Sequence, residues 1–150
     1  SIDPNMSWRL QDGCKMIYQL PGYERMLREY PNITFVFEYI SLKDTHVVKY
    51  TKEQEGLYLI GMRSNLTGEE YSYESILKFA KLYNIPTTEI FNKTLDDVMT
   101  ELDDKSSDEA EGFVINIDGY KVKLKYNDYV DYIPSYLNES YNFITKKEAV

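Results

Sequence analysis

Residues 111–126 have the sequence EGFVINIDGYKVKLKY, and this stretch predicts the fold more directly than any other. Apolar residues alternate with other residues over 113–117 and again over 120–124. Between these runs, Asp118-Gly119 is typical of a tight turn, because both residue types tolerate the positive φ angles that such turns require. The stretch therefore predicts a β-hairpin with a two-residue turn.

The turn length also determines which residues lie opposite each other. A two-residue turn places Ile117 opposite Tyr120, Ile115 opposite Val122, and Val114 opposite Lys123. One face is then apolar except for a tyrosine hydroxyl, and consists of Phe113, Ile115, Ile117, Tyr120, Val122 and Leu124. The other face consists of Val114, Asn116, Lys121, Lys123 and Lys125. A bulged turn with an extra residue would mix lysines with apolar residues, so burial favours the two-residue turn.

The sequence before the hairpin predicts further helices and strands. Apolar spacing predicts a short helix over residues 22–30, which Pro31 ends. Residues 34–40 and 47–50 predict strands. Residues 57–63 predict a third strand, almost wholly apolar and hence expected to be buried on both faces, and residues 65–68 predict a turn.

Two further helices are expected. Ser72 is a candidate N-cap for a helix that extends to Tyr83. Thr94 is a candidate cap for a second helix, whose apolar face comprises Leu95, Val98, Met99 and Leu102. Residues 103–110 are acidic and serine-rich and predict a surface loop. The predicted fold class is α+β, a mainly antiparallel sheet with flanking helices.

Composition limits the functions that the chain can have. Its 150 residues are enough for one domain, and the 43% hydrophobic and 28% charged residues are typical of globular proteins. The net charge of −8 argues against binding nucleic acid through bulk charge, so such binding needs a local basic cluster. The three hairpin lysines form that cluster, whereas Lys146-Lys147 lies in a polar tail and is expected to be solvated.

Single cysteine and histidine residues exclude other classes of site. Cys14 has no partner for an internal disulfide and fits a reducing cytoplasm. Cys14 and His46 alone cannot form a zinc cluster, and we interpret His46 as a surface or strand-edge residue. No apolar run is long enough to span a membrane, and the first residues lack the basic flank and apolar stretch expected of a secretory signal. We treat residues 1–5 as a candidate vector scar.

Each candidate site residue has a structural alternative. Lysines on one strand face can bind an anion, or can serve only to discourage edge-to-edge aggregation. Glu38 interrupts an apolar strand, so it either bonds to a ribose hydroxyl or points outward at a sheet edge. Glu111 is either a ligand or the end of an acidic loop.

Taken in order, four motifs are more specific than any one of them. FVFEYI at 35–40, LYLIGMR at 57–63, EGFVI at 111–115 and KLK at 123–125 resemble the later motifs of covalent nucleotidyltransferases, the DNA and RNA ligases and mRNA capping enzymes. The Phe-Glu-Tyr strand, Thr67-Gly68-Glu69, and the Lys-x-Lys followed by Tyr129-Val130 are most similar to the bacteriophage T4 RNA ligase family. The resemblance covers about residues 34–130.

This resemblance implies an adenylation domain and assigns expected roles. Glu38 matches the glutamate that contacts the ribose of the adenylate, and Tyr58 or Ile60 would line the adenine side. Val114 matches an apolar residue that packs on the adenine. We accordingly divide the chain into a partial adenylation domain over residues 6–130 and an extension over residues 131–150.

The resemblance also assigns the charged residues of the hairpin. Glu111 matches a carboxylate that helps to place the divalent metal and the phosphate. Lys123 and Lys125 match paired lysines that hold the phosphates. The implied cofactors are ATP or AMP and Mg²⁺, and the implied partners are RNA ends in the full-length enzyme. The predicted hairpin register agrees with these roles for the lysines, because it places both of them on one face. Simple alternation, however, would place Glu111 on the apolar face unless Gly112 redirects it.

The sequence departs from the family at the nucleophile. The family begins with a Lys-x-Asp-Gly-like motif, but Leu10 stands at the lysine position before Asp12-Gly13, and Lys15 lies on the wrong side of that dipeptide. We expect the missing portion to lie upstream of Met6 or on another polypeptide. The sequence therefore indicates part of an ATP-dependent RNA ligase that is inactive alone. The alternatives are a non-catalytic nucleotide- or RNA-end-binding remnant and, third, a tyrosine-rich protein-interaction module.

Overall fold

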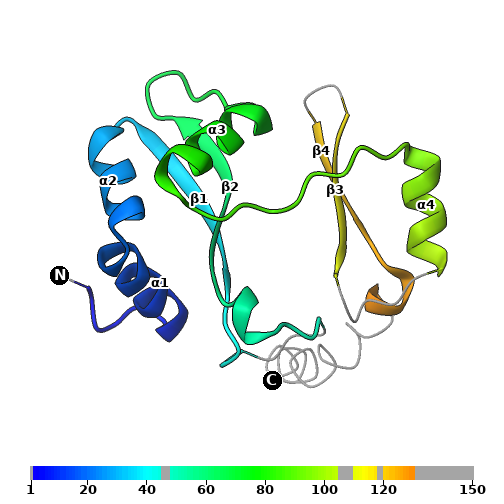
Figure 1. Cartoon of the computed structure of the whole chain (residues 1–150), viewed down its shortest axis with the longest axis horizontal. Coiled ribbons are helices and arrows are strands. Elements are labelled where there is room, and N and C mark those ends of the chain that lie inside the picture. The colour runs from blue at the N-terminus through cyan, green and yellow to red at the C-terminus, as the bar shows by residue number, and fades with distance from the viewer. Residues whose placement is uncertain (1, 45–47, 105–109, 118–119, 131–150) are drawn as a thin grey trace, which may run out of the picture. The chain divides into compact units, whose positions relative to one another are not determined.

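A computed structural model describes residues 2–44, 48–104, 110–117 and 120–130, with only the backbone described for Ile117 and Tyr120. The fold is α+β, as predicted, with two antiparallel pairs of strands (Figure 1). The chain divides into two compact units: unit 1 comprises residues 1–43 and 51–90, and unit 2 comprises residues 44–50 and 91–150. The predictions for His46, the Asp118-Gly119 turn and residues 131–150 lie outside the described residues.

Unit 1 contains two helices, a strand pair and a third helix. In chain order these are α1 (Trp8–Gln19), α2 (Pro21–Glu29), β1 (Ile33–Ile40), the 3₁₀ helix η1 (Lys52–Gln54), β2 (Gly56–Ser64) and α3 (Tyr73–Tyr83). The α2 and α3 predictions are confirmed, and the Ser72 hydroxyl caps α3 by accepting a hydrogen bond from the backbone N–H of Ser75.

The sequence did not predict α1. Gly13 lies inside this helix and lowers its intrinsic propensity. Tertiary packing compensates, because Met16 and Ile17 pack against the core and Gly13 is buried. A Cβ atom on Gly13 would lie 3.8 Å from the Leu57 side chain, so this part of α1 lies close to β2.

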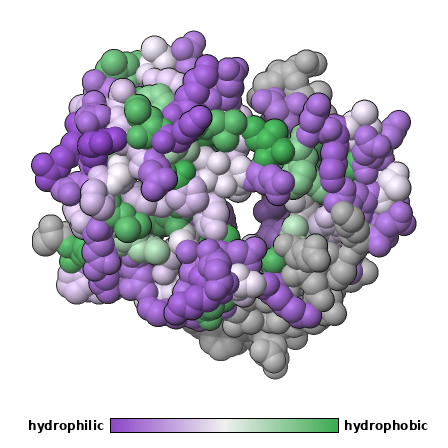
Figure 2. Space-filling model, viewed as in Figure 1, coloured by the Kyte–Doolittle hydropathy of each residue, from purple (hydrophilic) through white to green (hydrophobic). Residues whose placement is uncertain are grey.

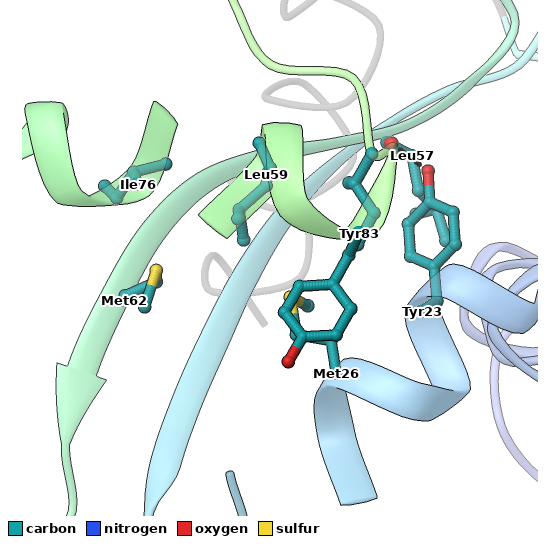
Figure 3. Packing of buried hydrophobic residues seen from close by; sticks show 9 residues of the cluster. Tyr23, Met26, Leu57, Leu59, Met62, Ile76 and Tyr83 are labelled. Carbon is teal, nitrogen blue, oxygen red and sulfur yellow. Dashed lines mark hydrogen bonds between the residues drawn. The ribbon is translucent and has the colours of Figure 1, made fainter. Parts of the chain in front are cut away.

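The core of unit 1 lies between one face of the strand pair and the helices. Side chains from α2, β2 and α3 meet there (Figure 3), namely Tyr23, Met26, Leu57, Leu59, Met62, Ile76 and Tyr83. The Tyr23 hydroxyl donates a hydrogen bond to the carbonyl oxygen of Leu57 at 2.7 Å, so the core also satisfies a buried polar group.

A β-bulge explains how β2 contributes to this core. The register pairs Val36 with Gly61 but Phe37 with Leu59, which leaves Ile60 as the extra residue. Without the bulge, Leu59 and Met62 would point to opposite faces, because side chains alternate along a strand. With it, both are buried while Ile60 is only half-buried. The prediction that β2 is buried on both faces was therefore wrong.

The predicted strand at 47–50 is also not observed. Residues 48–50 form no strand, and residue 47 lies outside the described residues. The backbone N–H of Tyr50 donates to the carbonyl of Val48 at 3.1 Å, a local contact that replaces pairing with another strand. Val48 is nevertheless buried, which accounts for its apolar character.

Unit 2 contains α4 (Leu95–Asp104) and a hairpin formed by β3 (Gly112–Ile117) and β4 (Tyr120–Lys125). The register confirms all three predicted pairs: Ile117 with Tyr120, Ile115 with Val122, and Val114 with Lys123. Three residues of the predicted apolar face, Phe113, Ile115 and Leu124, pack in a small core with Val98, Leu102 and Tyr126, whereas Val122 is 41% exposed and lies outside this core. The Thr94 hydroxyl caps α4 by accepting from the N–H of Asp97, as predicted.

Two predictions for α4 needed correction. Leu95 and Met99 were assigned to its apolar face but are largely exposed. Asp103 and Asp104 were assigned to a loop but belong to the last turn of α4, where the Asp103 carboxylate accepts a hydrogen bond from the Asn127 amide at 2.8 Å. The remainder of the predicted loop, residues 105–109, lies outside the described residues.

The face of the molecule shown in Figure 2 is predominantly polar among its described residues. The hydrophilic residues on this face are interrupted by separate apolar areas. Within the described part of the chain, no helix has both the length and the apolar character needed to cross a bilayer.

Candidate functional site

A compact charged cluster lies on the lysine face of the hairpin. The ammonium group of Lys123 lies 2.9 Å from a carboxylate oxygen of Glu111, and that of Lys125 lies 3.8 Å from the same oxygen. Because one carboxylate serves two ammonium groups, these three side chains carry a net charge of about +1 at neutral pH. The structure thus brings together the three residues that the sequence assigned to phosphate and metal binding.

Gly112 allows Glu111 to reach the lysines. Its φ of 146° is a conformation that residues with a Cβ rarely adopt. A Cβ at this position would lie 2.0 Å from the carbonyl oxygen of Leu124 and 2.6 Å from the Cα of Lys125. The Glu111 carbonyl accepts a hydrogen bond from the N–H of Tyr126 at 3.0 Å, which continues the strand pairing by one residue. Gly112 therefore interrupts the alternation, as the sequence analysis required.

The environment of Glu111 favours its ionised form. Burial raises the pKa of this carboxyl group, since desolvation disfavours charge. Hydrogen bonds from Lys123 and Tyr129 and the positive charges of Lys123 and Lys125 oppose this effect and outweigh it. The net result is a Glu111 pKa below its ordinary value. The carboxylate is therefore charged at neutral pH despite being partly buried.

Tyr129 completes the cluster. The ammonium group of Lys125 lies 4.4 Å from the centre of the Tyr129 ring, within the range of a cation–π interaction. Burial, followed by the hydrogen bond to Glu111, raises the pKa of Tyr129 to about 12, so the hydroxyl remains a donor. Tyr129 belongs to one of the family motifs but has no role assigned from the sequence, because spacing along the sequence does not reveal that the chain after β4 turns back toward Glu111.

Val114 lies on the same hairpin face as the lysines. It pairs with Lys123 across the strands, and 65% of its surface is exposed. An apolar side chain left open beside cationic groups could pack against a flat ring. This position is compatible with the adenine contact that the resemblance implied.

Glu38 and Tyr58 lie next to each other in unit 1. They are directly paired across β1 and β2, and Glu38 is exposed rather than buried. The cost of burying an unpaired carboxylate therefore does not arise, because Glu38 is open to solvent. The Tyr58 hydroxyl donates to the carbonyl of Gln54 at 3.0 Å, which connects β2 with η1.

Ile60 is the extra residue of the bulge in β2, and it is half-buried. It lies two residues after Tyr58 and lacks a partner in the β1–β2 register. Bulges change the direction of side chains and are frequent beside binding sites. The three candidates from unit 1 thus lie within one short stretch of the β1–β2 pair.

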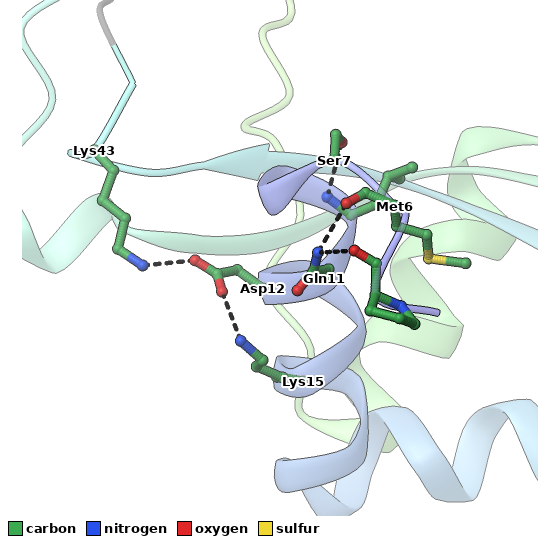
Figure 4. Close-up of polar contacts among 8 residues, drawn as sticks. Met6, Ser7, Gln11, Asp12, Lys15 and Lys43 are labelled. Atoms are coloured by element: carbon green, nitrogen blue, oxygen red, sulfur yellow. Dashed lines mark hydrogen bonds and ion pairs between the residues drawn. The ribbon is translucent and has the colours of Figure 1, made fainter. Parts of the chain in front are cut away.

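The stretch nearest to a nucleophile motif is helical. Asp12-Gly13 lies within α1, where the Asp12 carboxylate binds Lys43 at 2.6 Å and Lys15 at 3.2 Å (Figure 4). Hydrogen bonds from Lys43 and then Lys15 lower the pKa of Asp12. Both lysines are engaged with this carboxylate, and Leu10 stands where the motif requires lysine. This stretch therefore provides a salt-bridged helix surface and no nucleophile.

The described residues contain no group of three or more histidine, cysteine or acidic side chains that could hold a metal ion by themselves. Mg²⁺ is commonly held by one or two carboxylates together with the phosphates of a substrate. Glu111 supplies one carboxylate beside two phosphate-compatible cations, so the residues present fit a metal that arrives with a nucleotide.

Comparison with known proteins supports a family assignment. The RNA ligase family model of the bacteriophage T4 type matches residues 23–130, well over half of the chain. The match includes β1, β2 and the whole hairpin, and so all the candidate residues described above. A search of curated proteins found no match. The chain belongs to the bacteriophage T4 type of the RNA ligase family.

Proposed function

We propose that this chain supplies the nucleotide-binding part of the adenylation domain of an ATP-dependent RNA ligase. The observation that carries the proposal is the pairing of Lys123 and Lys125 with the single carboxylate of Glu111. The cluster retains positive charge on a face that an anion can approach, since half of the Lys123 side chain is exposed. Phosphate is the anion that paired lysines in this family would hold.

The other candidates take roles around the same nucleotide. Glu38 would accept hydrogen bonds from the ribose hydroxyls, and its exposed carboxylate is available for this. Tyr58 or Ile60 would line the adenine side, and Val114 would pack on the base. Support for these roles comes from family membership and from the exposure of Glu38 and Val114.

Mg²⁺ would supply charge neutralisation at the phosphates, with Glu111 as the protein carboxylate nearest to it. Lys123 and Lys125 would hold the phosphates in place and balance charge as pyrophosphate leaves. In the complete reaction a lysine attacks the α-phosphorus of ATP, AMP passes to an RNA 5′-phosphate, and a 3′-hydroxyl displaces it. Cations near the reacting lysine favour its neutral, nucleophilic form. We place this activity in the cytoplasm.

A second candidate function is nucleotide or RNA-end binding without covalent chemistry. It is favoured by one observation: Asp12-Gly13 lies in a salt-bridged helix and is preceded by Leu10 rather than lysine. Under this alternative the hairpin cluster has the same ligand but no adenylate is formed on the chain.

The phosphate role is tested by measuring ATP binding with isothermal titration calorimetry in the presence of Mg²⁺. We expect wild-type binding on the order of micromolar. Replacing both Lys123 and Lys125 with alanine should weaken it by at least about tenfold, since charge-assisted hydrogen bonds are lost. The matched control replaces Lys78 and Lys81, two exposed lysines of α3, and removes the same two positive charges. Equal losses in both variants would show that only net charge matters, and would refute the site.

The chemistry is tested with ATP radiolabelled at the α-phosphate. We expect no acid-labile AMP on this chain, because no lysine occupies the nucleophile position. Covalent labelling would overturn that expectation. Sequencing the genomic DNA immediately before the codon for Met6 separates the two candidate functions, since an in-frame Lys-x-Asp-Gly segment supports the ligase and its absence supports the binding remnant.

A further inference from the structure

Tyr129 lies beside both Lys125 and Glu111, which also form an ion pair with each other. The Lys125 ammonium lies 3.8 Å from the Glu111 carboxylate, which is too long for a hydrogen bond, but 4.4 Å from the centre of the Tyr129 ring. Lys125 is also the less exposed lysine, at 30% of its side chain against 54% for Lys123. Lys125 is therefore held between the Tyr129 ring, within cation–π range, and the Glu111 carboxylate, within ion-pair range.

The hydroxyl of Tyr129 acts at the other end of the same cluster. Its pKa is raised in part by the Glu111 carboxylate, which accepts a hydrogen bond from Lys123. The Tyr129 side chain thus lies against the Lys125 cation and is coupled electrostatically to the Glu111 anion. The carboxylate accepts a hydrogen bond from Lys123 and lies beyond hydrogen-bond distance of Lys125, so the Lys125 ammonium keeps donors for a ligand.

Tyr129 is itself held in place by unit 2. It lies in the helical turn at residues 127–130, directly after β4, and packs against the small core that contains Val98 and Leu102. Tyr126 at the start of this turn is buried, and the Asn127 amide donates to the Asp103 carboxylate at the end of α4. The turn is therefore fixed to both the hairpin and α4.

We propose that Tyr129 is a positioning residue for the phosphate-binding face, whose ring holds Lys125 and whose hydroxyl holds Glu111. This inference rests on the proposed function, because it assumes that the lysines bind phosphate. Its physical basis is preorganisation. Lysine side chains are flexible, and a site that has already restrained them loses less conformational freedom when the ligand binds. Tyr129 contributes in this way without contacting the ligand.

The contact between the ring and Lys125 has a spectroscopic signature that does not depend on any ligand. Protons held over an aromatic face are shifted upfield in NMR spectra. We expect an upfield shift for the ε-methylene of Lys125, and a smaller one for Lys123, in the nucleotide-free protein. The shift should persist in Tyr129→Phe and disappear in Tyr129→Leu. Ordinary methylene shifts for Lys125 in the wild-type protein would overturn the proposed arrangement.

The consequence for binding is tested with inorganic tripolyphosphate as the ligand, measured by calorimetry in wild-type protein and variants. We expect Tyr129→Leu to weaken binding by about fivefold, with Tyr129→Phe intermediate because it keeps the ring. In a Lys125→Ala background, Tyr129→Leu should weaken tripolyphosphate binding little more than Tyr129→Phe does, since the cation that the ring restrains is gone. If the affinities of Tyr129→Leu and Tyr129→Phe differ as much in the Lys125→Ala background as in the wild-type background, the ring acts through general packing and the proposal is refuted.

A second comparison of single and double variants tests the Tyr129 hydroxyl, and it can be made even if Tyr129→Leu fails to fold. Tyr129→Phe keeps the packing, and it should weaken binding in the wild-type background but not in a Glu111→Gln background. Unchanged binding by Tyr129→Phe and Tyr129→Leu, where the wild-type protein binds tripolyphosphate, would refute the positioning role alone. Absence of binding by the wild-type protein would refute the proposed function, and the positioning role with it.

Discussion

The Lys123 ammonium donates a hydrogen bond to the Glu111 carboxylate at 2.9 Å, linking the residue before β3 to the middle of β4. The same carboxylate lies 3.8 Å from Lys125. Two positive charges and one negative charge on one hairpin face leave a positive excess for an anionic ligand. Under the proposed function, this cluster is the part of the chain that binds nucleotide phosphates.

The backbone at Gly112 is expected to be essential for the cluster. Gly112→Ala should destabilise unit 2 by about 3 kcal/mol or more, because a Cβ would clash with the backbone of Leu124 and the φ angle would be strained. Denaturant unfolding monitored by hairpin amide signals in NMR spectra would measure the loss.

Gly56 provides the control for that substitution. Its φ of 155° is also unfavourable for alanine, but no atom lies within 4 Å of a Cβ built there. Gly56→Ala should therefore cost clearly less than Gly112→Ala. Equal costs would mean that the close approach to Leu124 is not the cause.

Acid is expected to weaken the hairpin cluster. The pKa of Glu111 is depressed, so the folded state binds this proton less readily than the unfolded state. The stabilising contribution is present above the ordinary glutamate pKa of about 4.3 and is lost as the pH falls through the lower folded value. Glu111→Gln should lack this acid-dependent loss, measured as the change in urea midpoint between about pH 7 and about pH 3. The control substitution Glu89→Gln, at an exposed position, should leave this acid-dependent loss of stability unchanged.

The core of unit 1 should be sensitive to the loss of Leu59. This side chain is 0% exposed, whereas Leu66 is 78% exposed. Leu59→Ala should lower the free energy of unfolding by about 3 kcal/mol through lost burial and a residual cavity. Leu66→Ala should change it by less than about 0.5 kcal/mol. Comparable effects of the two substitutions in denaturant unfolding would contradict the packing described for β2.

The buried hydroxyl of Tyr23 should contribute measurably to the free energy of unfolding. It donates to the carbonyl of Leu57, so Tyr23→Phe removes a hydrogen bond without creating a large cavity. We expect a loss of about 1 kcal/mol in thermal or denaturant unfolding. Tyr18 is mainly exposed, and Tyr18→Phe should leave stability nearly unchanged.

The sequence by itself determined the hairpin of unit 2 and its register. Alternation over residues 113–117 and 120–124 allowed only one arrangement that buries a continuous apolar face, because a shift of one residue turns each side chain to the opposite face. Helices α3 and α4 were likewise predictable, since Ser72 and Thr94 cap them locally. The ordered motifs then identified the family, which the match over residues 23–130 confirmed.

Tertiary structure decided the features that depend on contacts distant in sequence. Helix α1 forms although Gly13 disfavours it, because its buried face packs on the core. The bulge at Ile60 exists because Leu59 and Met62 must both reach that core. Tyr129 approaches Glu111 and Lys125 only because the chain turns back after β4, and no local pattern encodes that return. Local propensities and alternation act between neighbouring residues, whereas these three outcomes depend on the free energy of packing between segments far apart in the sequence.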